Sequence, residues 1–165
     1  VLVGLMGVGK TTVGRRLANA LGVDFIDADE EIERAADRSI SEIFAAHGEA
    51  YFRDGERRVI ARLMEEGHGV IATGGGAFVD GDTRAIVLEK GIAVWLDCDI
   101  DTLVERTARK DTRPLLKTGD PRTILRDLKE LRSAAYAQAH IHIVTDDGPH
   151  EVTVERLLKE LSGWQ

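Results

Sequence analysis

Cysteine, aromatic residues and long apolar runs are all scarce in this 165-residue sequence. A single cysteine, Cys98, excludes an internal disulfide framework and favours a reducing cytosol. No apolar run approaches the roughly 20 residues that a membrane-spanning helix needs, and no signal-peptide pattern is visible. We therefore predict a cytoplasmic protein that has no membrane partner. Because the chain begins at Val1 inside an expected strand, we also expect a few native residues before it.

Positive charge is also in short supply, since the net charge is −7. This balance argues against a general nucleic-acid binder, which would carry a basic stripe, although local arginines can still hold small anions. Hydrophobic residues make up 43% of the sequence, as in an ordinary globular protein. The length suits one core, so we predict a single domain over 1–165 and a monomer.

Short apolar runs alternate with helix-type patterns along the whole chain. The expected strands are VLVGL, VDFID, GVIAT, IAVWLD and HIHIVT. Ser39 and Glu42 fit a capping box that opens a helix. The segment KDTRPLLKTGDP, residues 110–121, lacks apolar periodicity and is expected to be a loop. Parallel strands joined by helices need right-handed crossovers. The sequence therefore predicts an α/β protein, a three-layer α/β/α fold with a central five-stranded parallel sheet.

A phosphate-binding loop follows the first expected strand. Gly4, Gly9, Lys10 and Thr11 satisfy the pattern G-x-x-x-x-G-K-[ST], and Gly7 adds another glycine. The glycines let backbone N–H groups turn toward anionic oxygens, and the next helix directs its positive dipole end to the same place. Lys10 can reach the β- and γ-phosphates, and the Thr11 hydroxyl can bind Mg²⁺. The loop therefore predicts ATP and Mg²⁺ as ligands.

Two acidic residues lie at the end of the second expected strand. Asp27 and Asp29 are two positions apart, so in extended chain both side chains point the same way. Ligands of parallel sheets bind beyond the carboxyl ends of the strands. One carboxylate could therefore lie near the metal while the other meets an acceptor hydroxyl. The alternative is a solvated acidic helix start.

Glycines and arginines farther along the chain supply further candidates. Gly74, Gly75 and Gly76 follow the third expected strand and could present bare N–H groups to a ligand. Arg53 and Arg132 could together hold a carboxylate by forked hydrogen bonds, although each could also be a solvated helical arginine. Arg113, beside Pro114, could close over a transferring phosphoryl group, or be an exposed loop residue.

Taken together, these motifs resemble those of the shikimate kinases over essentially the whole chain. The matching stretches are GLMGVGKTTVGRRLA, FIDADEEIE, SISEIFAAHGEAYFRDGE, TGGGA, RTARKDTRPLL and LRSAAY. The loop is common to many families, whereas the combination of D-x-D, F-R-x-x-E, G-G-G-A and R-P-L-L is far more specific. The resemblance implies transfer of the ATP γ-phosphoryl group to the 3-hydroxyl of shikimate, in aromatic amino-acid biosynthesis.

The resemblance also implies a role for each matching residue. Lys10, Asp29 and Arg113 would be catalytic, and Thr11 and Asp27 would hold the metal. The segment of about 28–58 would bind shikimate, and that of about 108–121 would be the lid. The residues expected around ATP are Gly7, Val8, Gly9, Lys10, Thr11, Thr12, Arg106, Arg113 and Pro149. Those expected around shikimate are Asp29, Phe44, Phe52, Arg53, Glu56, Gly74, Gly75, Gly76 and Arg132.

Two positions depart from the family pattern, and two other functions remain open. Ala134 stands where the family usually has proline, and Gly55 is unusual inside a helix and could loosen the shikimate side. A related kinase could act on another acceptor such as gluconate, with no need for a carboxylate clamp. A non-catalytic nucleotide-binding regulator would be expected to have lost Lys10, Asp27 or Asp29, and all three are present.

Overall fold

The computed structural model describes residues 1–108, 119–146 and 148–164. Its strands form one parallel sheet in the order β2-β3-β1-β4-β5. Leu2 of β1 pairs with Ala72 of β3 on one side and with Val94 of β4 on the other. The strands are β1 Leu2–Val3, β2 Phe25–Asp27, β3 Val70–Ala72, β4 Val94–Asp97 and β5 Ile141–Val144. The predicted α/β fold with a five-stranded parallel sheet is thus confirmed.

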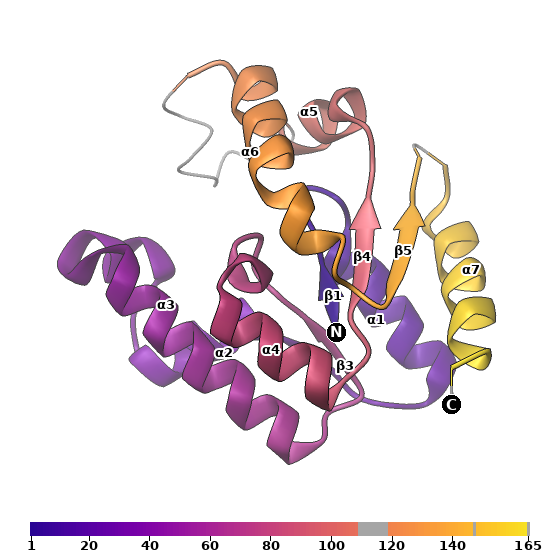
Figure 1. Ribbon diagram of the computed structural model, residues 1–165, viewed down its shortest axis with the longest axis horizontal. Helices are drawn as coiled ribbons and strands as arrows, with labels where there is room; N and C mark the ends of the chain where they lie inside the picture. Colours follow the sequence, from indigo (N-terminus) through magenta and orange to yellow (C-terminus); the bar gives the residue numbers. More distant parts are fainter. Residues whose placement is uncertain (109–118, 147, 165) are drawn as a thin grey trace.

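Helices cover both faces of this sheet. In Figure 1, α1 and α7 lie together on one side, and α3 and α4 lie together on the other. The helices are α1 Lys10–Leu21, α2 Ala28–Ala36, α3 Ile40–Glu66, α4 Gly81–Lys90, α5 Ile100–Ala108, α6 Pro121–Tyr136 and α7 His150–Ser162. A short 3₁₀ helix, η1 at Ala77–Val79, follows the glycines and was not expected from the sequence. The core between the layers includes Leu2, Ile60 and Leu96, each at most 1% exposed.

Local sequence signals set the limits of α3. The Ser39 hydroxyl accepts a hydrogen bond from the Glu42 N–H at 3.1 Å, as the predicted cap requires. Gly48 has φ 84° and ψ 179°, so the backbone leaves helical geometry there and α3 is kinked into two parts. The second part continues through Gly55 without a break. The departure from the family pattern at Gly55 therefore does not interrupt the helix.

The sheet order brings three segments of the chain together at the carboxyl edge. The phosphate loop follows β1, Asp27 ends β2, and the three glycines follow β3. Because β3 lies between β2 and β1, these segments are neighbours although they are far apart in sequence.

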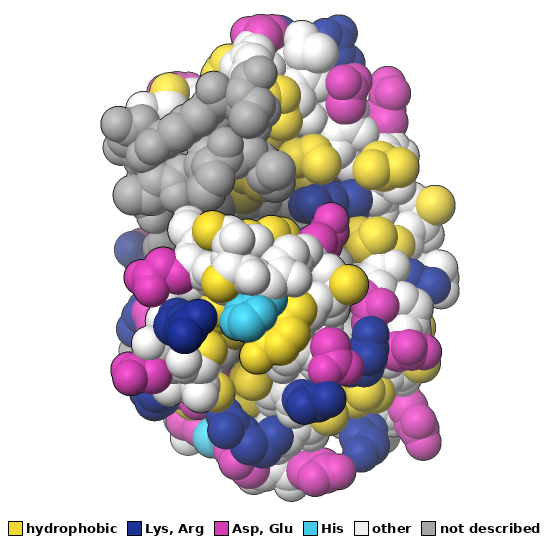
Figure 2. Space-filling view, turned by 90° about the vertical axis from the view of Figure 1, so that its left-hand side faces the viewer, with side chains coloured by type: hydrophobic (Ala, Val, Ile, Leu, Met, Phe, Trp, Pro, Cys, Tyr) yellow, Lys and Arg dark blue, Asp and Glu magenta, His cyan; other side chains and the backbone are white. Residues whose placement is uncertain are grey.

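Charged side chains of both signs are interspersed on the outer face that Figure 2 shows. Ion pairs among the described residues include Arg57 with Asp80 at 3.2 Å and Arg62 with Glu31 at 3.1 Å. In the ranges that the structure describes, no helix is long and apolar enough to cross a membrane.

Candidate active site

The phosphate loop ends in a helix N-terminus that is open to a ligand. Gly9 is the N-cap of α1 with φ 99°, and no side chain of the described residues caps this helix. Its first N–H groups therefore stay available to an anion, at the positive end of the helix dipole. Lys10 bends back over the loop, and its Nζ donates to the carbonyl oxygens of Gly4 at 2.5 Å and Leu5 at 3.1 Å.

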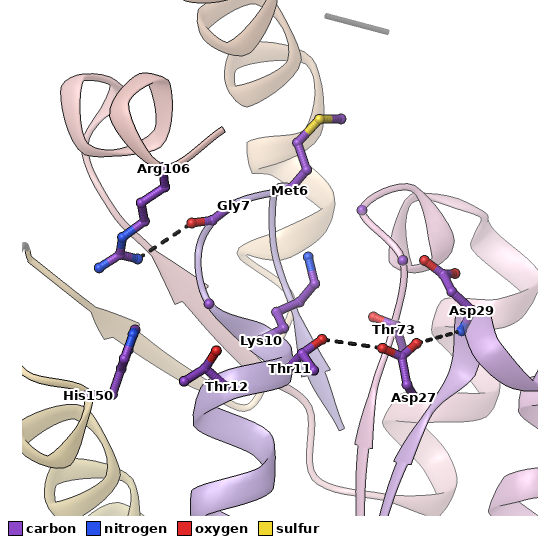
Figure 3. A pocket seen from close by; sticks show the side chains of 13 residues that line it. Met6, Gly7, Lys10, Thr11, Thr12, Asp27, Asp29, Thr73, Arg106 and His150 are labelled. Carbon is purple, nitrogen blue, oxygen red and sulfur yellow. Dashed lines mark hydrogen bonds between the residues drawn. The ribbon is translucent and has the colours of Figure 1, made fainter. Parts of the chain in front are cut away.

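Asp27 connects the loop to the start of α2. Its Oδ2 accepts a hydrogen bond from the Thr11 hydroxyl at 3.3 Å, and its Oδ1 accepts one from the Asp29 N–H at 2.9 Å (Figure 3). Asp27 is therefore the N-cap of α2 as well as a neighbour of the threonine. Asp29 lies in the first helical turn, so the prediction that an extended chain aligns the two carboxylates was wrong. Both still line one cleft, because the cap and the first turn face it.

The electrostatic environment of Asp29 favours its neutral form more than water does. Burial is the main cause that raises the pKa of Asp29, and the nearby carboxylate of Asp27 adds to it. Lys10 and Arg53 act in the opposite direction. A carboxyl group with a raised pKa is a stronger base than a solvated one, which suits a group that must take a proton.

A cleft of about 430 Å³ lies over the loop. In Figure 3, Arg106 and His150 lie at one end, Asp27 and Asp29 lie at the other, and Lys10 lies between them. The lining residues are Met6, Gly7, Gly9, Lys10, Thr11, Thr12, Asp27, Asp29, Thr73, Gly74, Gly75, Arg106 and His150. Lys10 thus lies between a basic and an acidic end of the cleft.

Each of the three glycines lies against one predicted acceptor-side residue. A Cβ at Gly74 would lie 2.8 Å from Asp29 Oδ1, and one at Gly75 would lie 3.0 Å from Arg132 Nη1. A Cβ at Gly76 would lie only 2.3 Å from Arg53 Nη2. The structure therefore brings the two arginines and the aspartate to adjacent residues of one segment.

The lack of side chains at these glycines makes room for those groups. Gly76 has φ −96°, a conformation that any residue adopts, so its backbone does not require glycine. The sequence predicts that the three glycines serve by exposing their N–H groups. Their contacts indicate a further reason, which is that a side chain here would displace the charged groups beside them.

A buried carboxylate holds the guanidinium group of Arg53. Arg53 Nη1 donates to Glu56 Oε1 at 2.8 Å, and the Glu56 side chain is only 1% exposed. Burial raises the pKa of Glu56, and Arg53 opposes that shift. The Arg53 Cζ atom lies over the Phe52 ring, 5.1 Å from the ring centroid. The ring centroids of Phe52 and Phe44 are 4.7 Å apart. These contacts fix Arg53 at the glycine segment.

Arg132 reaches the same place from α6 and has an unused donor. Its Nη1 is buried and has no hydrogen-bond partner among the described residues. A buried guanidinium nitrogen without an acceptor is costly, and a bound anion would supply the missing partner. This atom is therefore a candidate donor for an anionic ligand beside Gly75.

Arg106 closes the opposite end of the cleft. Its Nη1 donates to the Val8 carbonyl at 3.0 Å, and its Nη2 donates to the Asp146 carbonyl at 3.0 Å. It thus connects the phosphate loop to the segment before α7. Pro149 is the N-cap of α7, and the adjacent His150 lines the cleft. Val8 is buried behind the loop.

Three residues of the cleft were not predicted from the sequence, and one predicted residue lies outside the part of the chain that the structure describes. Met6, Thr73 and His150 line the cleft without having been predicted, although each adjoins a predicted segment. Position next to Pro149 was the only signal for His150. Arg113 lies in 109–118, outside the described residues, as does most of the expected lid.

The sheet order, the loop and the cleft together define a phosphotransferase that binds a nucleoside triphosphate. A family model described as shikimate kinase matches residues 6–162. A shikimate kinase from Novosphingobium aromaticivorans is 64% identical, over 99% of this chain and 87% of the relative. One from Caulobacter vibrioides is 60% identical, over 98% of this chain and 80% of the relative. The chain belongs to the shikimate kinase family.

Solved structures agree with this assignment. A shikimate kinase from Acinetobacter baumannii in complex with shikimate is 39% identical and superposes with a TM-score of 0.93, covering 99% of this chain and 93% of the other. A shikimate kinase from Aquifex aeolicus is 35% identical with a TM-score of 0.85, covering 98% and 95%. The family and the fold are therefore supported by both sequence and structure.

Proposed function

We propose that this protein transfers the γ-phosphoryl group of ATP to the 3-hydroxyl of shikimate, giving shikimate 3-phosphate and ADP. The observation that carries the proposal is the placement of Asp29, Arg132 and Arg53 against Gly74, Gly75 and Gly76. The guanidinium groups of Arg53 and Arg132 can bind a carboxylate. The Asp29 carboxylate, which lines the same cleft as the phosphate loop, can accept a hydrogen bond from a hydroxyl group of the acceptor. Shikimate carries both functional groups on one ring.

The proposed division of the cleft assigns ATP to the phosphate loop. Gly7, Gly9, Lys10, Thr11 and Thr12 line the part of the cleft that would hold its phosphates. Backbone N–H groups and Lys10 would bind the phosphate oxygens, while Val8 shapes the loop from behind. Arg106, with the segment around Pro149, would lie beside the adenine.

Thr11 and Asp27 have the donor atoms that Mg²⁺ needs. A hydroxyl and a carboxylate 3.3 Å apart suit a metal that binds few protein oxygens and completes its shell with phosphates and water. When bound, the metal neutralises charge on the β- and γ-phosphates. Binding of Mg²⁺ by Thr11 and Asp27 remains a prediction.

Asp29 would orient the acceptor hydroxyl and take its proton. The hydroxyl oxygen then forms a bond to the γ-phosphorus while the bond from that phosphorus to the β–γ bridging oxygen breaks, and ADP leaves. Lys10 would stabilise charge on the transferring oxygens, and Arg113 on the lid would join it. Phe44 and Phe52 would pack beside the ring, and Glu56 would keep Arg53 in place.

A coupled assay of ADP formation tests this function. ADP should form when shikimate is added, and gluconate at the same concentration should give far less. Equal turnover on gluconate would favour the related-kinase alternative, and ATP binding without turnover on either acceptor would favour a regulator. We also propose that residues 1–165 form a single domain and that the enzyme is monomeric and cytoplasmic. The net charge of −7 supports the further proposal that it has no nucleic-acid partner.

The space at Gly76 supplies a further test. Gly76→Ala should push the Arg53 guanidinium aside, because the new Cβ would lie 2.3 Å from Nη2. We expect the shikimate KM to rise about 10-fold and the ATP KM to change little, since a displaced charge-assisted hydrogen bond costs about 1.5 kcal/mol or more. Steady-state kinetics with each substrate varied in turn would measure both values.

Gly55→Ala is the matched control for Gly76→Ala. A Cβ at Gly55 would meet nothing within 4 Å, and the residue lies inside α3. Alanine should stabilise the helix by about 0.5–1 kcal/mol without changing either KM. A shikimate KM in Gly76→Ala that stays at the Gly55→Ala value would contradict the steric argument.

A further inference from the structure

Tyr136 is a buried polar residue that no step of the proposed reaction uses. Its side chain is 1% exposed, and its hydroxyl donates a hydrogen bond to the Gly75 carbonyl. Its ring packs against that of Trp95, with the ring centroids 5.7 Å apart. The hydroxyl therefore joins the end of α6 to the glycine segment, 61 positions earlier in the sequence.

The same helix touches the glycine segment a second time. Arg132 lies one turn before Tyr136, and a Cβ at Gly75 would lie 3.0 Å from Arg132 Nη1. In Figure 1 the C-terminal half of α6 lies beside the loop that carries η1. Arg132 and Tyr136 thus contact one residue, Gly75, by a guanidinium group and by a hydroxyl.

A second anchor holds α6 on the other side of Arg132. Lys129, three positions earlier, donates to the Cys98 carbonyl at 3.2 Å and lies 3.2 Å from Asp97 Oδ1 at the end of β4. Arg132 is therefore between two points at which the helix is tied to the carboxyl edge of the sheet. These two ties flank the helical turn that carries Arg132, whose Nη1 is buried and has no hydrogen-bond partner among the described residues.

The hydrogen bond to Gly75 also orients a peptide plane. No peptide bond of the described residues is cis, so the Gly75 carbonyl and the Gly76 N–H point in opposite directions. With the carbonyl directed at Tyr136, the Gly76 N–H must point away from it. The hydroxyl thus orients the backbone of the glycine segment at the residue that lies beside Arg132.

We infer that Tyr136 is a positioning residue for the acceptor, which sets Arg132 and the Gly75–Gly76 peptide for the shikimate carboxylate. This inference rests on the proposed function. Tyr136 does not touch the reacting atoms, so its loss should affect acceptor binding rather than ATP binding. Burial raises the pKa of Tyr136, which keeps the phenol protonated as a donor at neutral pH.

Tyr136→Phe tests the inference because phenylalanine keeps the ring and removes only the hydroxyl. We expect the shikimate KM to rise about 5- to 10-fold, since the Gly75 carbonyl loses its donor in a buried place. The ATP KM and the kcat at saturating shikimate should stay within about twofold. Thr145→Val is the matched control, because it removes another buried hydroxyl that donates to a backbone carbonyl, that of Asp97 at 3.2 Å.

The possible outcomes separate the positioning role from the function. If wild type forms ADP with shikimate but Tyr136→Phe has an unchanged shikimate KM, the positioning role is overturned and the function stands. An equal rise in the shikimate KM and the ATP KM of Tyr136→Phe would show a general loosening of the fold and would also overturn the positioning role. The same conclusion would follow if Thr145→Val raised the shikimate KM as much as Tyr136→Phe does. A wild type that does not use shikimate overturns both.

Discussion

Replacing Lys10 by alanine should lower kcat by about 100- to 1,000-fold, the effect usual for loss of one group that stabilises a transition-state charge. The Lys10 ammonium lies over the phosphate loop, held by the Gly4 and Leu5 carbonyls at 2.5 and 3.1 Å. In the proposed reaction it moves onto the phosphate oxygens, where charge spreads as the phosphoryl group transfers. Single-turnover measurements with saturating ATP and shikimate would show the loss directly.

Lys90→Ala is the control for this variant. Lys90 lies on α4 with 42% of its side chain exposed and pairs with Glu65 at 3.7 Å. An exposed ion pair contributes little to stability, so this change should leave kcat unaltered. A Lys10→Ala enzyme that keeps more than about a tenth of the wild-type kcat would argue against the assigned role.

The second large effect is expected at Arg53. Arg53→Ala should raise the shikimate KM by about 100-fold and leave the ATP KM nearly unchanged, because a forked guanidinium–carboxylate pair is worth roughly 3 kcal/mol. The variant should also lose stability, by about 3 kcal/mol, because Glu56 would be left buried without its partner. Urea unfolding and steady-state kinetics would measure the two effects.

A double variant separates binding from stability. Adding Glu56→Gln to Arg53→Ala removes the stranded charge and should recover most of the stability, while the shikimate KM stays high. Arg58→Ala is the neutral control, since its side chain is 80% exposed and pairs only with Asp54 among the described residues. A double variant that regains both stability and a low shikimate KM would show that Arg53 serves the fold rather than the substrate.

Much of the fold was predictable because its signals are local. The phosphate loop lies between a buried strand and an amphipathic helix, and α1 begins at Lys10 as the motif requires. The cap at Ser39 could be predicted from four residues of sequence, and the structure contains it. The 3₁₀ helix after the glycines was missed because three residues carry no periodicity that distinguishes them from a loop.

The site was less predictable because its contacts join distant parts of the chain. The sequence suggests that Arg53 and Arg132 could share a ligand, but only the packing of α3 and α6 around the glycine segment brings them to Gly76 and Gly75. Asp29 was assigned to the right cleft for the wrong local reason, since helix α2 begins at Ala28 and the chain is therefore already helical at Asp29. Tyr136 ends the matching stretch LRSAAY, but the sequence predicts no role for its hydroxyl, because that role depends on one long-range hydrogen bond.

A crystal structure of the protein with shikimate and ADP would test the central claim most directly. We predict the shikimate carboxylate within about 3 Å of the guanidinium nitrogens of both Arg53 and Arg132, with a ring hydroxyl at the Asp29 carboxylate and the ADP phosphates on the loop. The previously unpartnered Arg132 Nη1 should then donate to that carboxylate. Shikimate bound with its carboxylate away from both arginines, or outside the cleft, would contradict the account.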